Sequence, residues 1–477
     1  MDFKSINLKV GLEIHQQLDT HKLFCSCSSE MSKMPYSVIE RKQHPIQSEL
    51  GEVDIASQYE YLRNRKFYYE IFPHETCLVE LDEEPPHSIN QEALKTALQI
   101  AVLLNCEIPE EIHVMRKSII DGSTPSSFQR TMVVGLNGFL KFRGQKIGIS
   151  HVSLEEDAAS ALKEEDGKIF FRLNRVGIPL VEISTETLSN FTPQDIQEIA
   201  YQIGLITRST RKVKRGIGTI RQDLNVSVKN GERVEIKGVQ DLGLLAKVVE
   251  NEANRQLKLP KVKKEVRGAL PDGTTKFLRP LPGAARMYPE TDLVPILISR
   301  EETDRIKKEL PEPMTSKLEK FEKKMSSQLA EQIIRSEYLD LFELILTKFK
   351  VDASIVANTF LSTLKDLEKR EKVKVENLKE EHFMEVFDYL EKGRIVKEAI
   401  PQILKFFAEN PKSNIHSAIE KLHIKPLSDE ELEKIVREVQ KQFPENADKI
   451  IGVIMSKVRG RIEARKVIET VKRIVKK

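Results

Sequence analysis

The stretch Arg221-Gln-Asp-Leu-Asn-Val-Ser-Val-Lys-Asn-Gly-Glu-Arg-Val-Glu-Ile-Lys237 decides the fold of this chain. Polar and apolar residues alternate on both sides of its central Lys-Asn-Gly-Glu segment, as they do in strands that bury one face. The stretch therefore predicts an antiparallel hairpin with one apolar face and one polar face.

The length of the turn determines which side chains of the hairpin meet. A two-residue Asn-Gly loop would mix polar with apolar side chains on both faces. A three-residue loop, with Gly231 in the left-handed conformation, instead pairs Asp223 with Lys237 and Asn225 with Glu235. Such an array suits a hydrated divalent cation and polyphosphate, because Mg²⁺ is bound through one or two carboxylates, waters and substrate phosphates.

Two other predicted strands extend this polar face. In the run Leu8–Gln17, Glu13 and His15 point to the side opposite the apolar residues, although a solvated outer face is the alternative interpretation. Glu182 lies within the otherwise apolar run Ile178–Ile183, where an unpaired carboxylate would be costly to bury. We therefore expect these three residues to take part in the same polar site.

The distribution of glycine predicts the domain organisation. Eighteen of the 21 glycines lie in the first 283 residues, and amphipathic helical patterns dominate the remainder. We expect an α+β protein with a large strand-rich catalytic cradle domain at 1–293, an all-α helical domain at 294–410 and a small helical tail domain at 411–477. Within the first domain, a capped helix is expected to begin at Thr192-Pro193 and to stop at Gly204.

Composition excludes several classes of protein. With 477 residues, 40% of them hydrophobic, the chain is long enough for two to four domains and is not disordered. A net charge of +3 means that any nucleic-acid surface must come from local clustering. Four cysteines, no signal-like segment and no apolar run of membrane-spanning length predict a cytoplasmic protein without a membrane partner. The common phosphate loops are missing, so a nucleotide would be bound by side chains on a sheet.

The chain also carries an ordered set of motifs. They are Gly11-Leu-Glu-Ile-His-Gln-Gln17, Phe24-Cys-Ser-Cys27, Thr76-Cys-Leu-Val-Glu-Leu-Asp-Glu-Glu-Pro-Pro86, Asp121-Gly-Ser123, Leu154-Glu-Glu-Asp157, Asn174-Arg-Val-Gly-Ile-Pro-Leu-Val-Glu-Ile183, Arg221-Gln-Asp-Leu-Asn-Val-Ser227 and Pro282-Gly-Ala-Ala-Arg-Met-Tyr-Pro-Glu-Thr-Asp292. Together they resemble the GatB/GatE family of glutamyl-tRNA(Gln) amidotransferase subunits, and its archaeal GatE branch more closely than its bacterial and organellar GatB branch.

The resemblance implies an ATP-dependent ligase that forms carbon–nitrogen bonds with glutamine as the amido donor. Such subunits phosphorylate the γ-carboxylate of glutamate mischarged on tRNA(Gln), using ATP and Mg²⁺. Ammonia from a GatD-type glutaminase subunit then displaces the phosphate. The expected partners are therefore Glu-tRNA(Gln) and the GatD-type subunit, in a heterodimer or a dimer of heterodimers. The alternatives are a non-catalytic RNA-binding adaptor that retains the fold and a GatB-type subunit.

The resemblance also implies roles for single residues. Its catalytic set is His15, Glu13, Glu182, Asp223 and Glu235. Of these, His15 and Glu182 are expected to bind Mg²⁺ together with Glu156. Glu155 is the alternative to Glu156, because an acidic run does not reveal which member faces inward and is often simply solvated.

Three basic residues are the expected phosphate contacts: Lys237, Arg221 and Arg286. Arg286 has an equally good structural interpretation, in which it pairs with Glu290 or Asp292. One departure from the family is expected within 252–268. Other members carry an insertion there that is related to a domain of bacterial aspartyl-tRNA synthetases, and this chain lacks it.

A zinc site is a further expectation. Cys25-x-Cys27 and His74-x-x-Cys77 offer three sulfur ligands and one nitrogen ligand. The bacterial relatives carry a four-cysteine zinc site in this region. The alternative interpretation is a vestigial knuckle of reduced cysteines.

The C-terminal segment is locally cationic. From Ile451 to Lys477 it contains nine basic residues and two acidic ones. The candidates for tRNA binding are Lys457, Arg459, Arg461 and Arg465. Charge alone is equally compatible with a solvated basic helix, but the segment resembles the tRNA-binding tail of the family.

Overall fold

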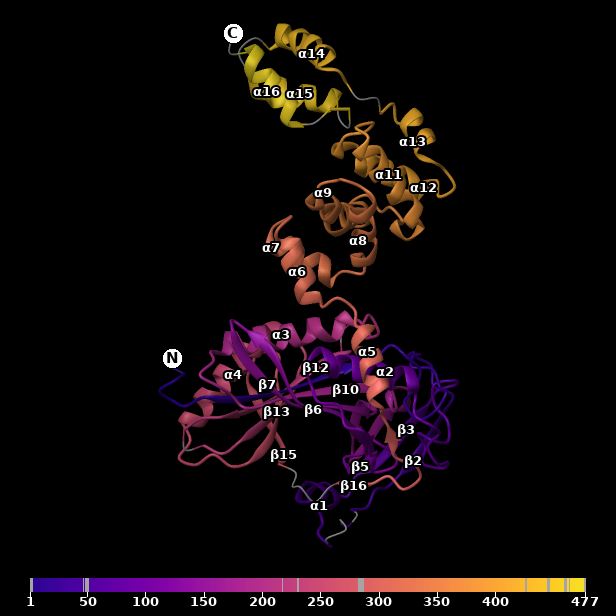
Figure 1. Cartoon of the computed structure of the whole chain (residues 1–477), viewed down its shortest axis with the longest axis vertical. Coiled ribbons are helices and arrows are strands. Elements are labelled where there is room, and N and C mark those ends of the chain that lie inside the picture. The colour runs from indigo at the N-terminus through magenta and orange to yellow at the C-terminus, as the bar shows by residue number, and fades with distance from the viewer. Residues whose placement is uncertain are drawn as a thin grey trace. The chain divides into compact units, whose positions relative to one another are not determined.

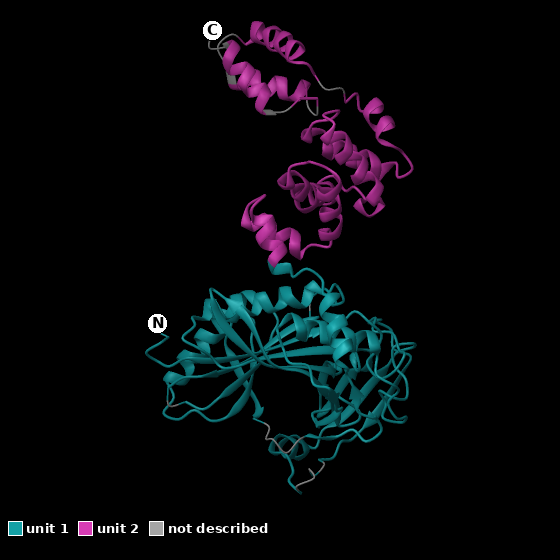
Figure 2. Cartoon of the chain, in the orientation of Figure 1, with its two compact units in different colours: residues 1–315 teal, residues 316–477 magenta. Residues whose placement is uncertain are grey.

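The computed structural model of the chain describes residues 3–45, 47, 51–216, 218–229, 231–281, 287–424, 427–443, 447–458, 461–462 and 464–475. The chain divides into two compact units, Met1–Thr315 and Ser316–Lys477, which Figure 2 colours separately. The first unit is rich in strands and the second is helical. The expected α+β class, with a strand-rich region followed by helices, is therefore confirmed.

The first unit is built on a large, mostly antiparallel sheet. In the described ranges the sheet has eleven strands, in the order β15-β14-β13-β12-β1-β10-β7-β6-β5-β16, with β11 paired to β1 off this path. Their bounds are β1 (Lys9–Gln17), β5 (Met115–Ser118), β6 (Phe128–Phe142), β7 (Gln145–Glu156), β10 (Pro179–Thr185), β11 (Leu188–Ser189), β12 (Ile220–Ser227), β13 (Val234–Val239), β14 (Glu265–Ala269), β15 (Thr275–Pro280) and β16 (Met287–Pro289).

Smaller elements extend the first unit beyond this sheet. A second sheet has the order β2-β3-β9-β8, and β4 pairs with β17. The bounds are β2 (Ser37–Arg41), β3 (Lys66–Ile71), β4 (Glu111–Ile112), β8 (Ser160–Glu165), β9 (Lys168–Arg172), β17 (Ile296–Leu297) and the helix α1 (Ile55–Leu62). Tyr69 and Phe171 stack in the core of the second sheet, with ring centroids 5.8 Å apart.

Helices cover one face of the large sheet. Figure 1 shows α3 (Pro193–Ser209) and α4 (Leu242–Leu257) running along this face, and α2 (Gln91–Leu103) and α5 (Arg300–Lys308) lie nearby. Apolar strand residues such as Leu12, Val226 and Ile236 are buried in the core that these helices share with the sheet. The other face of the sheet is left to the polar residues.

The helix expected at Thr192 is present but longer than predicted. Thr192 and Asp195 form a reciprocal capping box, with Pro193 in the first turn. The helix passes Gly204 and ends at Ser209, so the prediction that Gly204 stops it is wrong. Leu205 is buried in the next turn. This burial outweighs the roughly 1 kcal/mol that an interior glycine costs a helix.

The β12–β13 hairpin has the predicted register over most of its length. Asn225 pairs with Glu235, as expected. The predicted turn is wrong, because β12 ends at Ser227 and Gly231 does not have a positive φ. Asn230 lies outside the described residues.

The backbone pairing predicted for Asp223 and Lys237 is also wrong. The register shifts between Gln222 and Leu224, and Gly238 adopts the left-handed φ of 80° at this irregularity. The two side chains still meet, because Lys237 Nζ lies 3.0 Å from Asp223 Oδ2.

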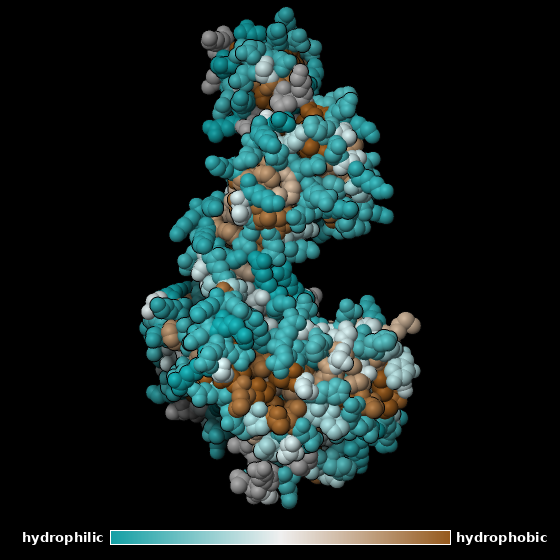
Figure 3. Space-filling model, turned by 45° about the vertical axis from the view of Figure 1, so that its right-hand side comes forward, coloured by the Kyte–Doolittle hydropathy of each residue, from teal (hydrophilic) through white to brown (hydrophobic). Residues whose placement is uncertain are grey.

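The second unit consists of helices. Their bounds are α6 (Met314–Glu322, which begins at the boundary), α7 (Ser327–Arg335), α8 (Leu339–Lys348), α9 (Ala353–Asn358), a π-helical turn (Thr359–Thr363), α10 (Leu364–Lys369), α11 (Glu380–Glu391), α12 (Ile400–Glu409), α13 (Ile415–Lys421), α14 (Asp429–Gln442), α15 (Ala447–Lys457) and α16 (Ala464–Val475), with short 3₁₀ turns at Val375–Asn377 and Lys397–Ala399. On the face shown in Figure 3, the surface of this unit is mostly hydrophilic. No helix in the described ranges is long and apolar enough to cross a membrane.

Candidate active site

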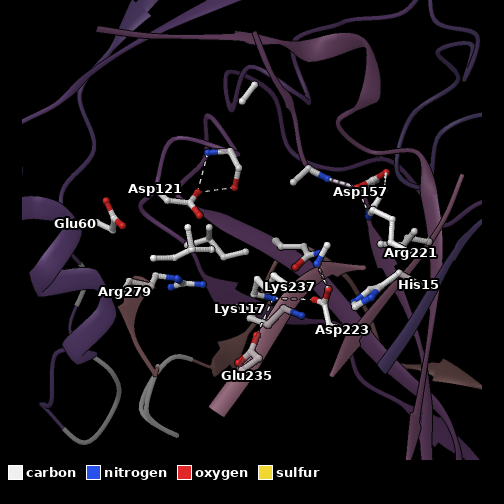
Figure 4. A pocket seen from close by; sticks show the side chains of 18 of the residues that line it. His15, Glu60, Lys117, Asp121, Asp157, Arg221, Asp223, Glu235, Lys237 and Arg279 are labelled. Atoms are coloured by element: carbon white, nitrogen blue, oxygen red, sulfur yellow. Dashed lines mark hydrogen bonds and ion pairs between the residues drawn. The ribbon is translucent and has the colours of Figure 1, made fainter. Parts of the chain in front are cut away.

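A cavity of about 1070 Å³ opens on the polar face of the large sheet, within the first unit. Its lining residues come from β1, β7, β10, β12 and β13, and from α1, β8, β9 and β15. Figure 4 shows His15, Asp223 and Lys237 gathered at one side of it. Its volume lies slightly above the roughly 300–1,000 Å³ typical of small-molecule sites.

Strand alternation places the polar residues together. In β1, Leu12 is buried in the core, whereas Glu13 and His15 line the cavity. The row continues across neighbouring strands, because His15 lies opposite Glu182 on β10 and opposite Arg221 on β12. The prediction that these side chains share one face is confirmed.

His15, Glu155 and Glu182 form a first cluster, whose ligand atoms lie within 4.8 Å of one another. His15 Nε2 lies 3.0 Å from Glu182 Oε2 and 3.9 Å from Glu155 Oε1. Lys117 Nζ donates to Glu155 Oε2 at 2.8 Å, and His151 Nε2 lies 3.6 Å from Glu182 Oε1. Each carboxylate thus has one oxygen near His15 and the other near a second basic side chain.

These contacts determine the charges of the first cluster. Burial lowers the pKa of His15, but its hydrogen bond to Glu182 and the surrounding carboxylates outweigh burial and raise the pKa to about 9. Burial raises the pKa of Glu182, but Lys117, His15 and His151 together hold it well below its usual value. At neutral pH and without a bound cation, His15 is therefore positively charged and Glu182 negatively charged.

The structure brings Glu155, not the predicted Glu156, into this cluster. Successive side chains of β7 point to opposite faces, so Glu156 points away from His15. Its Oε2 instead accepts a hydrogen bond from the backbone N–H of Arg130 at 3.2 Å. Burial raises the pKa of Glu156 against the opposing effect of Arg130. The expected ligand set is corrected to His15, Glu155 and Glu182.

Glu13, Asp223 and Glu235 form a second cluster, whose oxygens also lie within 4.8 Å of one another. Lys237 Nζ bridges two of these acids, at 3.0 Å from Asp223 Oδ2 and 2.8 Å from Glu235 Oε1. Asn225 Nδ2 donates to Glu13 Oε1 at 2.8 Å. Three acids are thus held together by one ammonium and one amide.

Two acids of the second cluster, Glu13 and Asp223, differ in proton affinity. Burial raises the pKa of Glu13, and the charges of Glu182 and Glu235 raise it further. Burial also raises the pKa of Asp223, but Lys237, His15 and the backbone N–H of Gly238 together outweigh burial and lower it. Glu13 is therefore the acid that holds a proton more readily and Asp223 the one that remains charged.

Of the expected phosphate contacts Arg221 and Arg286, the structure describes only Arg221. Arg221 lines the cavity, and its Nη2 lies 3.0 Å from Asp157 Oδ1. Arg286 lies outside the described residues. Glu290, one of its two expected partners, accepts a hydrogen bond from Arg116 Nη2 at 2.6 Å.

The cysteine cluster differs from the expectation at one position. Cys25, Cys27, Cys77 and Glu80 offer ligand atoms within 4.8 Å of one another. His74, the expected fourth ligand, is exposed and does not belong to this group. Glu80 takes its place because its Oε2 accepts from the backbone N–H of Cys77 at 2.7 Å, which turns the carboxylate toward the thiols. Hydrogen bonds from Cys25 and Cys77 lower the pKa of Cys27 to about 4.

The expected tRNA-binding residues lie in the last helices. Lys457 is exposed in the last turn of α15. Arg465 is exposed at the start of α16 and pairs with Glu469 at 2.8 Å. Arg461 is half-buried, and Arg459 lies outside the described residues. These helices share an apolar core that includes Ile454, Ile462, Val467 and Val471.

Several groups that line the cavity are not among the predicted residues. They are Lys117, His151, Asp157 and Arg175. His151 lies four residues before Glu155 on β7 and therefore on the same face, a spacing that a strand pattern could have revealed. The other three reach the site through long-range pairing or through loops, which no local pattern reveals.

Comparison with known proteins identifies relatives over the whole length. The GatB/GatE catalytic domain model matches residues 8–304, and the GatB domain model matches residues 340–475. The E subunit of the glutamyl-tRNA(Gln) amidotransferase of Methanocaldococcus jannaschii is 35% identical over 628 aligned positions, which cover 100% of this chain and 99% of the relative.

Two further archaeal proteins with the same name are similarly related. The one from Saccharolobus solfataricus is 34% identical, with 99% of this chain and 98% of the relative covered. The one from Aeropyrum pernix is 33% identical, with 100% and 98% covered. The alignments run over 628 and 632 positions, whereas this chain has 477 residues, so the relatives carry residues that have no counterpart here.

Proposed function

The chain belongs to the GatB/GatE family, and on this premise we propose that it is the subunit of an amidotransferase that converts the glutamyl group of Glu-tRNA(Gln) into a glutaminyl group. The full-length similarity to archaeal proteins named as the E subunit of such an enzyme supports the proposal. The observation that carries it is the pair of carboxylate clusters on one wall of a single cavity. A scaffold protein would have no use for so many buried acids.

The proposed reaction has two steps that balance in atoms and charge. An oxygen of the γ-carboxylate attacks the γ-phosphorus of ATP, and ADP leaves. Ammonia then attacks the carbonyl carbon of the resulting acyl phosphate, the bond from this carbon to the phosphate oxygen breaks, and inorganic phosphate leaves with one proton from the nitrogen. Both steps need positioning and neutralisation of charge more than covalent help from the protein. The amines of Lys117 and Lys237 and the guanidinium of Arg221 supply positive charge along the cavity wall.

Both carboxylate clusters have the donor chemistry for Mg²⁺. Glu13, Asp223 and Glu235 form an all-oxygen set, which suits this hard cation. Lys237 lies between two of these acids, so it screens them from each other in the absence of a cation. When bound, Mg²⁺ would neutralise part of the negative charge of the ATP phosphates.

The first cluster has a mixed donor set of His15, Glu155 and Glu182. His15 must lose its proton before its ring nitrogen can serve as a ligand, because a protonated imidazole has no lone pair to offer. The contacts of Glu182 with His151 and of Glu155 with Lys117 do not involve His15, so they still hold both acids in place after that proton leaves.

The remaining parts of the proposal concern partners. A GatD-type glutaminase subunit would supply the ammonia, in a heterodimer or a dimer of heterodimers, in the cytoplasm. The exposed Lys457 and Arg465 of the tail would contact tRNA phosphates. The group of Cys25, Cys27, Cys77 and Glu80 would hold zinc, since three sulfurs and one carboxylate oxygen match its preferred ligands.

The proposal is tested by purifying the chain with its candidate glutaminase partner and measuring ADP release. ADP is expected only when Glu-tRNA(Gln) is supplied. His15→Ala, Glu182→Ala and Asp223→Ala should each abolish this release and leave the partner's hydrolysis of free glutamine intact. His113→Ala is the matched control, because His113 is exposed and pairs with Glu111 at 2.9 Å.

Three outcomes would contradict parts of the proposal. Normal formation of Gln-tRNA(Gln) by all three variants would remove both clusters from the mechanism. Tight binding of tRNA without any ADP release by the wild-type complex would favour a non-catalytic RNA-binding adaptor. Activity with a GatB-type set of partner subunits, and none with a GatD-type subunit, would assign the chain to the GatB branch.

A further inference from the structure

A group of lysines lies on the surface of the first unit. Four of them lie in the connection that leads from α4 to β14, and one lies in the turn between β12 and β13. All are exposed: Lys229, Lys258, Lys261, Lys263 and Lys264. We call this group the basic surface. Because the net charge of the whole chain is only +3, a surface for nucleic acid has to come from a local group of this kind.

Two contacts bring the connection and the turn together. Gln256 Nε2, in the last turn of α4, donates to the carbonyl of Val226 at 3.1 Å. β13 and β14 pair in parallel, with Val234 opposite Glu265. Both ends of the connection are therefore held beside the β12–β13 hairpin, whose turn carries Lys229.

The connection is anchored at its centre. Val262 is 5% exposed and belongs to the core of the first unit. Lys261 and Lys263 flank it, and Pro260 restricts the backbone just before them. A segment held in this way loses less conformational freedom on binding than an unanchored loop does.

The positive charge of the basic surface is largely unbalanced. Lys264 Nζ lies 3.7 Å from Glu232 Oε2. Within the described ranges, the other four ammonium groups form no ion pair and no hydrogen bond. Five lysines against one glutamate leave a net charge of +4. Nearby arginines do not add to this charge, because each has a glutamate partner. These pairs are Arg255 with Glu252 at 2.8 Å and Arg267 with Glu265 at 2.9 Å.

The basic surface adjoins the opening of the cavity. The register of β13 and β14 places Arg233 beside Lys264. Arg233 lines the cavity and is itself exposed, so it lies at the rim. In the proposed function, the 3′ end of the tRNA carries the glutamyl group into this cavity. The phosphates of the neighbouring nucleotides then pass over the rim, close to the lysines.

We propose that the basic surface binds phosphates in the acceptor arm of the tRNA, as a contact separate from the one proposed for the tail. The identity of the RNA rests on the proposed function, whereas the unbalanced charge does not. An RNA backbone fits this surface better than an acidic protein does, because lysine is depleted at protein–protein interfaces. The compact charge of lysine suits phosphate contacts, which position a nucleic acid without reading its sequence.

Salt-dependent binding tests the surface without requiring turnover. Labelled, uncharged tRNA(Gln) is titrated with the full chain over a range of KCl concentrations, and binding is followed by fluorescence anisotropy. A variant that combines Lys258→Gln, Lys261→Gln and Lys263→Gln should bind about 10- to 100-fold more weakly at about 0.1 M salt. The slope of log K against log[KCl] should become less negative by about 2 to 3, because each lost phosphate contact releases about 0.7 to 0.9 fewer counterions. Arginine at the same three positions keeps the charge and should preserve the affinity of the wild type.

The matched control combines Lys33→Gln, Lys42→Gln and Lys141→Gln. These lysines are also exposed in the first unit, and within the described ranges they form no ion pair and do not line the cavity. The control removes the same charge from other places, so its affinity and salt slope should stay close to those of the wild type. Circular dichroism checks that both triple variants are folded.

Footprinting locates the contact on the tRNA. Iodine cleavage of phosphorothioate-substituted tRNA reports which phosphates the bound protein protects. Phosphates of the acceptor arm should be protected by the wild type and by the control. The same phosphates should be cleaved in the complex with the first triple variant.

The proposal is overturned if the first triple variant keeps the affinity and the salt slope of the wild type, if the control loses as much affinity, or if the lost protection lies outside the acceptor arm. A first triple variant that binds tRNA normally but no longer co-purifies with the glutaminase partner would assign the surface to that protein instead. A wild-type complex that releases no ADP but shows the expected binding and footprint would overturn the proposed function and leave the RNA-binding surface standing.

Discussion

Replacing Lys237 by methionine should destabilise the first unit and make its stability depend on Mg²⁺. Methionine keeps the length of the side chain and removes its charge. Lys237 Nζ lies 3.0 Å from Asp223 Oδ2 and 2.8 Å from Glu235 Oε1, and Glu13 completes the group of acids. Without the ammonium, three carboxylates would face one another within 4.8 Å.

The size of the effect follows from the exposure of the partners. The side chains of Asp223 and Glu235 are 10% and 12% exposed, whereas that of Lys237 is 38% exposed. Breaking a fully buried pair costs about 3–5 kcal/mol and breaking a surface pair costs about 0–1 kcal/mol. Because the exposure of Lys237 is intermediate, we expect its replacement to lower the free energy of unfolding by about 2 kcal/mol.

Urea unfolding followed by circular dichroism measures this loss, since the chain contains no tryptophan for fluorescence. Lys66→Met is the matched control, because Lys66 pairs with Glu40 at 2.7 Å on the surface, where the side chains are 55% and 46% exposed. Its free energy of unfolding should stay close to that of the wild type, because water screens an exposed pair.

Mg²⁺ provides the second readout for Lys237→Met. A cation that binds only the folded state at one hundred times its dissociation constant adds about 2.7 kcal/mol. The gain should be larger in the variant than in the wild type, because the ammonium no longer competes for the acids. An equal gain in both proteins, or a loss no greater than that of Lys66→Met, would refute this account of the cluster.

Three further perturbations test other parts of the structure. The free energy of unfolding lost in Glu290→Gln should be about 1–3 kcal/mol at pH 7. Burial raises the pKa of Glu290, but Arg116, the backbone N–H of Asp292 and Arg130 together outweigh burial and lower it from 4.5, so this difference between wild type and variant should shrink as the pH falls below 4.5; a difference that stays constant to pH 3 would contradict the assignment. Elemental analysis should find about one zinc per wild-type chain and per His74→Ala chain, and much less in Glu80→Ala; a wild type with far less than one zinc would remove the site. Deletion of 425–477 should strongly raise the Michaelis constant for Glu-tRNA(Gln) and flatten its salt dependence while the first unit stays folded, and an unchanged salt slope would show that the tail does not bind tRNA.

The parts of the site that lie on regular strands could be predicted from the sequence. The alternation around Glu13 and His15, and the isolated acid Glu182 in an apolar run, were sufficient to place them on a polar face. The pairing of Asn225 with Glu235 followed from the same argument, because the register of a two-residue loop would have mixed polar with apolar side chains on both faces.

The predictions failed where no periodic pattern was available. Glu155 and Glu156 are adjacent acids, so the choice between them depended on the pairing of β7 with β10, which is a long-range property. His74 and Glu80 lie in a turn-rich segment, where the backbone path decides which side chain reaches the cysteines. The helix continues past Gly204, because the burial of the residues that follow stabilises it more than the glycine destabilises it.

The position of Arg175 beside Asp157 and Arg221 could not be predicted from the sequence. Arg175 follows β9, whereas Arg221 lies on β12 and Asp157 follows β7, so their meeting depends on the whole topology of the first unit. Nothing in the composition of these three segments distinguishes their charges from those of ordinary surface residues.

The fold and the site depend on the same property of the sequence, the register of the central strands. A shift of β1 by one residue would turn Glu13 and His15 into the core and expose Leu12 and Ile14, so the burial of apolar residues opposes any slip. The energy that holds the sheet together therefore also holds the acids, the lysines and His15 in position across neighbouring strands. A site distributed in this way needs no flexible glycine-rich loop to gather its ligands. Its geometry changes only if the core of the sheet changes with it.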